Sequence, residues 1–190
     1  LGMHSYTLHL WGFGQNWQIV EAPRPKKINL VELMDLACEW NLDGLHITGC
    51  DLERKDDTRL IEVKEEAADR GLYLEYNYSL NDKYDNRLND TVEEGIVIAH
   101  KLGADIAKLS MDIVRPRPLY GSCMHPFVME QLVKIYKQVL KAITLLEQYS
   151  IKLALENHTE TYADEVIWLI DHINHPLVGA CVDTVNSMAV

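Results

Sequence analysis

The sequence lacks the features of membrane proteins and of secreted, disulfide-rich proteins. It contains no apolar run near the roughly 20 residues that a membrane helix needs, and its first residues do not follow a signal-peptide pattern. The four cysteines, Cys38, Cys50, Cys123 and Cys181, are scattered without a CxxC pair, which is typical of reduced thiols. We therefore expect a cytoplasmic protein with no membrane partner.

Positive charge is also scarce in this chain. Lys and Arg number 18 against 29 Asp and Glu, which gives a formal net charge of −11. An acidic surface repels the phosphate backbone of DNA and RNA. The composition therefore predicts no nucleic-acid partner.

Nucleotide-binding motifs are missing as well. Neither a GxGxxG nor a Walker A sequence follows a strand-like segment, and the GFG of residues 12–14 lacks the spacing of a dinucleotide site. What the chain does contain is 190 residues, 47% of them hydrophobic, in alternating strand-like and helix-like segments. The expected strands are 1–8, 42–49, 72–79, 105–111, 151–157 and 178–184. The expected helices are 28–41, 58–70, 89–102, 125–149 and 162–173.

Strands that alternate with helices predict βαβ units and a parallel sheet, either open or closed into a barrel. In the segment 151–157 one face carries Leu153 and Leu155, and the other carries Ala154 and Glu156. A bulky apolar face suits covering helices, whereas a smaller face that ends in a polar group is typical of a barrel interior. We therefore predict an α/β fold of the (β/α)₈ TIM-barrel class. Because eight units need about 250 residues, residues 1–190 should form a single TIM-barrel domain that has about six βα units and lacks the last two.

Two carboxylates, Glu156 and Asp183, end consecutive predicted strands on this smaller face. Neighbouring parallel strands lie about 4.8 Å apart, so we expect these carboxylates to converge within a few ångströms. Two like charges there must share a proton or bind a cation. The alternative is that each carboxylate caps the following helix or pairs with a nearby lysine.

The segment LALENHTETYADEVIWLIDHINHPLVGACVDTVNS, residues 153–187, resembles two consecutive units of the xylose-isomerase-like sugar phosphate isomerase/epimerase superfamily. There, a strand that ends in Glu-Asn-His is followed by a helix and a Val-Gly-x-x-x-Asp-Thr strand. The resemblance implies that Glu156 and Asp183 are metal ligands and that Glu156 is the catalytic base. The family's other two ligands, a His and a Glu, lie on strands seven and eight, which this sequence does not contain. Many members carry a His three residues after the Asp, and here that residue is Asn186.

The resemblance implies a metal-dependent isomerase or epimerase of a sugar, cyclitol or related polyol that acts through an enediolate. The implied cofactor is a divalent metal, Mn²⁺ first, with Mg²⁺, Co²⁺ and Zn²⁺ as alternatives. A dehydratase or a C-glycoside-cleaving lyase would use the same deprotonation, and an inactive or truncated binding protein is a further alternative. DNA repair of the AP-endonuclease type needs a basic surface, which the net charge of −11 disfavours.

Other polar and aromatic residues share the predicted inner face or follow its strands. The candidates for contact with a small sugar or polyol substrate are His4, Tyr6, Trp11, His46, Lys108, His158 and Asn186. His158 could instead cap a helix entry, and Lys108 could instead form a covered salt bridge, for example with Glu75. The aromatic loop 11–17 is either a lid over the substrate or a subunit contact in a homo-oligomer.

Overall fold

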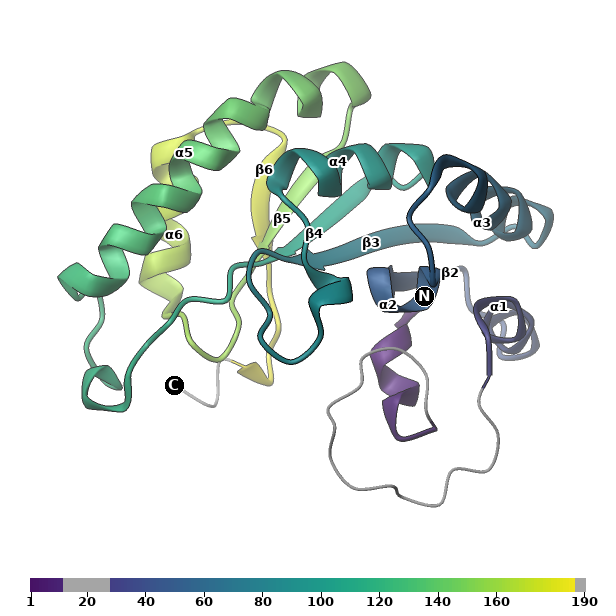
Figure 1. Ribbon diagram of the computed structural model, residues 1–190, viewed down its shortest axis with the longest axis horizontal. Coiled ribbons are helices and arrows are strands. Elements are labelled where there is room, and N and C mark those ends of the chain that lie inside the picture. Colours follow the sequence, from purple (N-terminus) through teal and green to yellow (C-terminus); the bar gives the residue numbers. More distant parts are fainter. Residues whose placement is uncertain (12–27, 187–190) are drawn as a thin grey trace.

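The computed structural model describes residues 1–11 and 28–186, and Figure 1 shows their arrangement. Six parallel strands form one sheet in the order β1-β2-β3-β4-β5-β6. Each strand therefore pairs with its neighbour in the sequence, whereas a doubly wound sheet reverses its order part-way across. This sequential order confirms the TIM-barrel class. The strands are Gly2–His4, Gly44–Thr48, Tyr73–Ser79, Ile106–Ser110, Lys152–Glu156 and Val178–Cys181.

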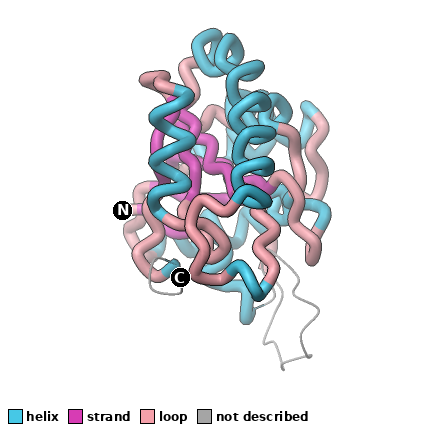
Figure 2. The backbone as a smooth tube through the Cα atoms, turned by 90° about the vertical axis from the view of Figure 1, so that its left-hand side faces the viewer, coloured by secondary structure: helices cyan, strands magenta, loops and turns pink. Residues whose placement is uncertain are grey.

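Helices follow the strands and cover one face of the sheet, so that the strands lie inside an outer helical layer (Figures 1 and 2). Capping boxes that the sequence encodes locally begin several of the helices, among them Asn29 with Glu32 and Thr91 with Glu94. The α-helices are α1 Leu30–Glu39, α2 Gly49–Leu52, α3 Asp57–Asp69, α4 Val92–Lys101, α5 Pro126–Tyr149 and α6 Ala163–Ile173. The 3₁₀ helices are η1 Ser5–Trp11, η2 Asn86–Leu88 and η3 Arg117–Leu119.

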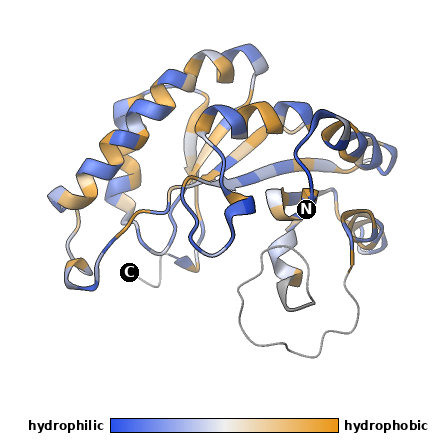
Figure 3. Ribbon diagram, in the orientation of Figure 1, coloured by the Kyte–Doolittle hydropathy of each residue, from blue (hydrophilic) through white to orange (hydrophobic). Residues whose placement is uncertain are grey.

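The core lies between the sheet and this helical layer. Leu45 and Ile47 of β2, Leu109 of β4, and Leu153 and Leu155 of β5 are all buried on the helix-facing side. Figure 3 shows hydrophobic residues concentrated where α4 lies over the central strands. The core therefore holds the sheet through one face, which leaves the opposite, more polar face for chemistry.

The first predicted strand is wrong in its second half. The strand ends at His4, and the chain then turns into η1 instead of continuing to Leu8. Two side-chain contacts hold this turn: the Ser5 hydroxyl donates to Asp51 Oδ2 at 2.6 Å, and the backbone N–H of Tyr6 donates to His4 Nδ1 at 2.9 Å. These contacts replace the hydrogen bonds that a longer strand would have made with β2.

The sixth strand is also shorter than predicted, because it ends at Cys181 and leaves Asp183 in the following turn. Within the ranges that the structure describes, every helix is too short or too polar to cross a membrane.

Candidate active site

The strand register places a row of polar side chains on the inner face of the sheet. His4 is the register partner of His46, and Lys108 is the partner of both Asn77 on β3 and Ala154 on β5. Side chains two residues apart on a strand share a face, so Glu156 follows Ala154 on this side. The alternation that predicted an inward Glu156 therefore describes the sheet correctly.

Glu156 is buried at the end of β5, with 5% of its surface exposed, and it is not isolated. Its Oε2 lies 2.6 Å from Lys108 Nζ and accepts a hydrogen bond of 2.7 Å from the Ser110 hydroxyl. Lys108 is itself only 7% exposed. The buried carboxylate therefore has a buried cation and a hydroxyl donor as partners, both supplied by β4.

These partners set the protonation state of Glu156. Burial alone would raise the pKa of this carboxyl, but the charge of Lys108 and the hydrogen bonds from Lys108 and Ser110 outweigh burial and hold the pKa below its usual value. Glu156 is therefore ionised at neutral pH. An ionised carboxylate in a covered site is the form that a general base requires.

Asp183 is positioned by the residue that follows Glu156. The Asn157 side chain accepts a hydrogen bond of 2.6 Å from the backbone N–H of Asp183 and donates one of 2.9 Å to its carbonyl. The Asp183 carboxylate accepts from the backbone N–H groups of Val185 and Asn186. Asn157 therefore ties the ends of β5 and β6 together and brings both carboxylates to the same end of the sheet.

A cavity of about 420 Å³ opens over these residues, and we call it the Glu156 cavity. It brings together most of the residues that the sequence predicted for the site. His4 and Tyr6 line it from the first unit, and Lys108 lines it from β4. The other predicted residues in its wall are Glu156, His158, Asp183 and Asn186.

His46, predicted as a substrate contact, is not among the residues that line this cavity. Its ring packs on the His4 ring at 4.3 Å between centroids, and its Nδ1 lies 3.9 Å from the Glu75 carboxylate. Lys108 forms its salt bridge with Glu156 and not with Glu75, the alternative partner that the sequence offered. Burial and the charge of Lys108 lower the pKa of His4 to about 4, and burial together with His4 and Lys108 holds the pKa of His46 well below its usual value. Both rings are therefore neutral at pH 7. The side chain of Trp11 and the rest of the aromatic loop 11–17 lie outside the described residues.

His158 lies just beyond β5 and is paired with Glu160 through its Nδ1. The hydrogen bond that His158 donates to Glu160 outweighs the effect of burial and raises the pKa of His158. This imidazole is therefore a donor toward the cavity over a wider pH range than an isolated histidine.

Several polar residues in the wall of the Glu156 cavity are not among the predicted candidates, Ser110 and Asp112 among them. Strand alternation could have found Ser110, because it shares a face with Lys108. Asp112 has a left-handed backbone with φ of 50°, for which the sequence carries no signal. Burial and the nearby carboxylates of Glu160 and Asp82 raise the pKa of Asp112 to about 6.

The donor chemistry fits a divalent cation in part. Glu156 and Asp183 supply carboxylate oxygens, the ligands that Mg²⁺ and Mn²⁺ prefer, and both line the same cavity. Glu156 Oε2 is engaged by Lys108 and Ser110, whereas its Oε1 has no hydrogen-bond partner among the described residues. Across residues 1–11 and 28–186, no cluster of three or more His, Cys, Asp or Glu side chains is arranged around a metal position. The two carboxylates fit as two members of a larger ligand set.

A family model described as xylose isomerase-like TIM barrel matches residues 34–190. The chain belongs to this family. The match includes Lys108, Glu156 and Asp183 and extends over the strands β2 to β6. It confirms the resemblance that the Glu-Asn-His and Val-Gly-x-x-x-Asp-Thr segments indicated.

Relatives in this family have several activities. The chain is 22% identical over 168 residues to 3-oxo-isoapionate decarboxylase of Pectobacterium atrosepticum, and the match covers 87% of this chain and 54% of that protein. It superposes on D-psicose 3-epimerase, crystallised in the presence of D-fructose, with a TM-score of 0.67 and 13% identity, over 97% of this chain and 63% of that one. The IOLI protein, solved with a zinc atom, gives a TM-score of 0.62 at 14% identity, over 84% and 59% of the two chains. At these identities the structural likeness shows the fold, and the chain spans between 54% and 63% of each relative's length.

Proposed function

We propose that this protein is a metal-dependent isomerase or epimerase of a sugar, cyclitol or related polyol, and that it works through an enediolate. The observation that carries the proposal is the buried, ionised Glu156, held beside Lys108 in a cavity that Asp183 also lines. A carboxylate base with an adjacent cation is what removal of a proton from carbon next to a carbonyl requires. The sugar epimerase among the structural relatives supports the same reading.

Glu156 removes the proton in this proposal. Its carboxylate takes the proton from the carbon that bears the hydroxyl, and the electron pair of that C–H bond moves toward the carbonyl oxygen. Delivery of a proton to the opposite face of the same carbon by a second acid gives an epimer. Delivery of the proton by Glu156 to the neighbouring carbon, with transfer of the hydroxyl proton to the former carbonyl oxygen, gives an isomer. His158, which lines the same cavity, donates a hydrogen bond to a substrate oxygen.

Lys108 stabilises the charge that develops. While Glu156 is ionised, its charge balances that of Lys108 at 2.6 Å. Once Glu156 has taken the proton and become neutral, the positive charge of Lys108 balances the enediolate oxygen instead. The charge at the site is thus conserved through the step, which limits the cost of forming an anion in a covered cavity.

A divalent metal is the cofactor that we propose, with Mn²⁺ first and Mg²⁺, Co²⁺ and Zn²⁺ as alternatives. Glu156 and Asp183 would hold it, and when bound it would supply Lewis-acid polarisation of the substrate oxygens. The zinc atom in the IOLI protein supports a metal in this fold.

The test is exchange of carbon-bound hydrogen with solvent. The protein is incubated with Mn²⁺ in D₂O with D-fructose, D-psicose or D-tagatose, and deuterium in the recovered sugar is measured by NMR and mass spectrometry. We expect deuterium at the carbon next to the carbonyl, together with an epimer or isomer, and neither with Glu156→Gln. Full exchange by the Glu156→Gln variant with metal still bound would overturn the assignment of the base.

Decarboxylation is a second candidate, which the 22% identical curated relative favours. Loss of CO₂ next to a carbonyl also leaves an enolate that Lys108 could stabilise, but it requires no base to remove a proton from carbon. Offering a 3-oxo acid and measuring CO₂ release separates the two. A decarboxylase should retain substantial activity in Glu156→Gln, whereas an isomerase should lose it.

A further inference from the structure

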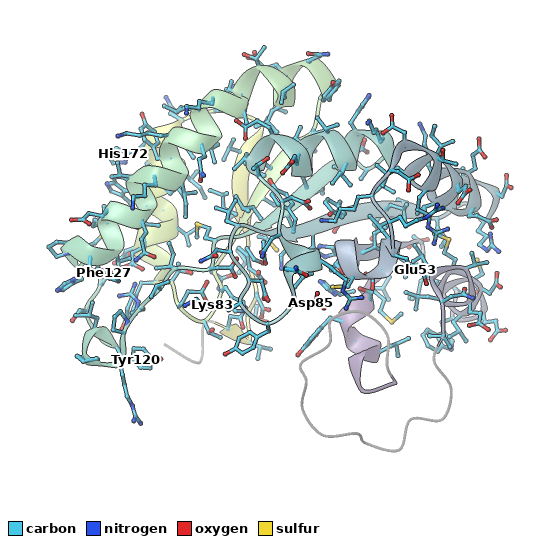
Figure 4. The ribbon with its side chains drawn as sticks, in the orientation of Figure 1. Glu53, Lys83, Asp85, Tyr120, Phe127 and His172 are labelled. Atoms are coloured by element: carbon cyan, nitrogen blue, oxygen red, sulfur yellow. The ribbon has the colours of Figure 1, made fainter. Side chains whose placement is uncertain are left out.

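Beside the Glu156 cavity lies a second, larger cavity of about 600 Å³, which the proposed reaction does not use. Its walls are the loops 81–84, 112–121 and 158–162, which follow β3, β4 and β5. These loops belong to the middle of the sheet, away from β1 and β6 at its edges. We call it the Tyr120 cavity, and Figure 4 shows Tyr120 and Lys83 on the same side of the molecule.

The two cavities adjoin. Asp82, Asp112 and His158 line both of them, so a ligand in one can extend into the other. Asp112 is held at this boundary by its left-handed backbone and by a hydrogen bond of 2.9 Å from the backbone N–H of Asn81 to its Oδ2. The Glu156 cavity alone, at about 420 Å³, already falls within the 300–1,000 Å³ that holds a whole small ligand. The Tyr120 cavity therefore has space for a second part of a larger ligand.

The rim of this second cavity is aromatic. Tyr84 and Tyr120 line it and are 64% and 68% exposed. Tyrosine combines a flat apolar face with a hydroxyl that forms hydrogen bonds, and such faces pack on the C–H side of sugar rings. Ile113 and Val114 add apolar surface between the loops. The lining thus suits a flat ring that has polar groups at its edge.

The charges of the lining select against anionic ligands. Asp82, Asp112 and Glu160 contribute carboxylates, which accept hydrogen bonds from hydroxyl groups. Arg115 already donates to a buried carboxylate and to two backbone carbonyls. Lys83 is the other lysine or arginine in the lining. A phosphate or carboxylate on the ligand would be repelled, because the lining has more carboxylates than cations that are available to pair with it. The hydroxyl groups of a sugar would instead find hydrogen-bond acceptors.

We propose that the Tyr120 cavity is a second binding subsite for an uncharged sugar ring joined to the polyol unit in the Glu156 cavity. The substrate is then a glycoside or disaccharide, and the second ring stacks on Tyr84 and Tyr120 while its hydroxyls donate to the carboxylates of the lining. This inference rests on the proposed function, because it takes the Glu156 cavity as the place of reaction.

The test is calorimetric titration of the wild type and of Glu156→Gln, so that binding is measured with and without turnover. The probes are D-glucose and D-fructose, and the disaccharides cellobiose, maltose and sucrose. We expect at least one disaccharide to bind about tenfold more tightly than its component monosaccharides, the value of one aromatic stacking contact. Tyr120→Ala should remove this preference and Tyr120→Phe, which keeps the ring, should retain it, with unchanged thermal unfolding in both.

Equal affinities for disaccharides and monosaccharides, or an unchanged preference in Tyr120→Ala, would overturn the subsite. Tighter binding of phenyl β-D-glucoside than of every disaccharide would overturn its assignment to a sugar ring. Tighter binding of D-glucose 6-phosphate than of every disaccharide would overturn the assignment of the subsite to an uncharged ligand. Failure of deuterium exchange together with a retained disaccharide preference counts against the proposed reaction alone, so the two failures are distinguishable.

Discussion

Lys108 Nζ lies 2.6 Å from Glu156 Oε2, and both side chains are buried. Removing two charges from water is costly, and their attraction repays this cost only when the geometry is close and other donors assist. Here Ser110 supplies the additional donor. The pair is therefore sensitive to the loss of either member, which leads to the first prediction.

Lys108→Met should destabilise the protein by about 3–5 kcal/mol at pH 7, because it leaves an ionised carboxylate buried without its cation. The free energy of unfolding is measured by denaturant titration. Lys101→Met is the matched control, since Lys101 pairs with Asp57 at the exposed surface and should cost at most about 1 kcal/mol. Equal losses in the two variants would contradict a buried pair.

The same pair gives a pH dependence with a definite sign. Because the folded protein holds the pKa of Glu156 below its usual value, the stability that this group contributes is present above the unfolded pKa. It is lost as the pH falls through the folded value. The difference in unfolding free energy between wild type and Glu156→Gln should therefore be largest at pH 7 and shrink below about pH 4. A difference that grows toward acid pH would mean that Glu156 is protonated in the folded protein.

Asp112 should behave in the opposite way. Its pKa is raised to about 6, so the stability it contributes is fully present below the ordinary value and is lost as the pH rises through 6. Asp112→Asn should raise the free energy of unfolding at pH 8 by about 1–3 kcal/mol and leave it nearly unchanged at pH 4. Asn also tolerates the left-handed backbone at this residue. The exposed Asp171→Asn is the control, with little expected change at either pH.

The sequence predicted what depends on alternation and order along the chain. The six strands and the inward direction of Glu156 follow from the alternation of apolar and polar residues, which can be recognised within the sequence of each single strand. The pairing of Lys108 with Glu156 joins residues 48 positions apart along the chain and depends on strand register and side-chain rotamers. From the sequence alone, Lys108 could contact the substrate or pair with a carboxylate such as Glu75, so its true partner was not predicted. The turn after His4 depends on a contact with Asp51, and local strand propensity cannot reveal such a distant partner.

Arg115 and Glu165 form a second buried pair, which joins the loop after β4 to the first turn of α6. Glu165 also accepts hydrogen bonds from the backbone N–H groups of Tyr162 and Met124. Glu165→Gln should leave the Arg115 charge unbalanced and cost about 3–5 kcal/mol of unfolding free energy. Glu62→Gln, at the exposed surface of α3, should cost less than about 1 kcal/mol. A small loss in Glu165→Gln would mean that backbone carbonyls alone satisfy Arg115.

Glu160 should control the protonation of His158. The hydrogen bond between them raises the pKa of His158, so Glu160→Gln should lower that pKa by removing both the charge and the ionised acceptor. The imidazole signals are followed by NMR titration between pH 4 and pH 9, a range that spans the ordinary histidine pKa of about 6.5. His172, labelled on α6 in Figure 4, lines neither cavity, and its imidazole signals serve as the internal control that should be the same in both proteins. If His158 also titrates identically in both, the pair does not persist in solution, and its role as a donor over a wider pH range is withdrawn.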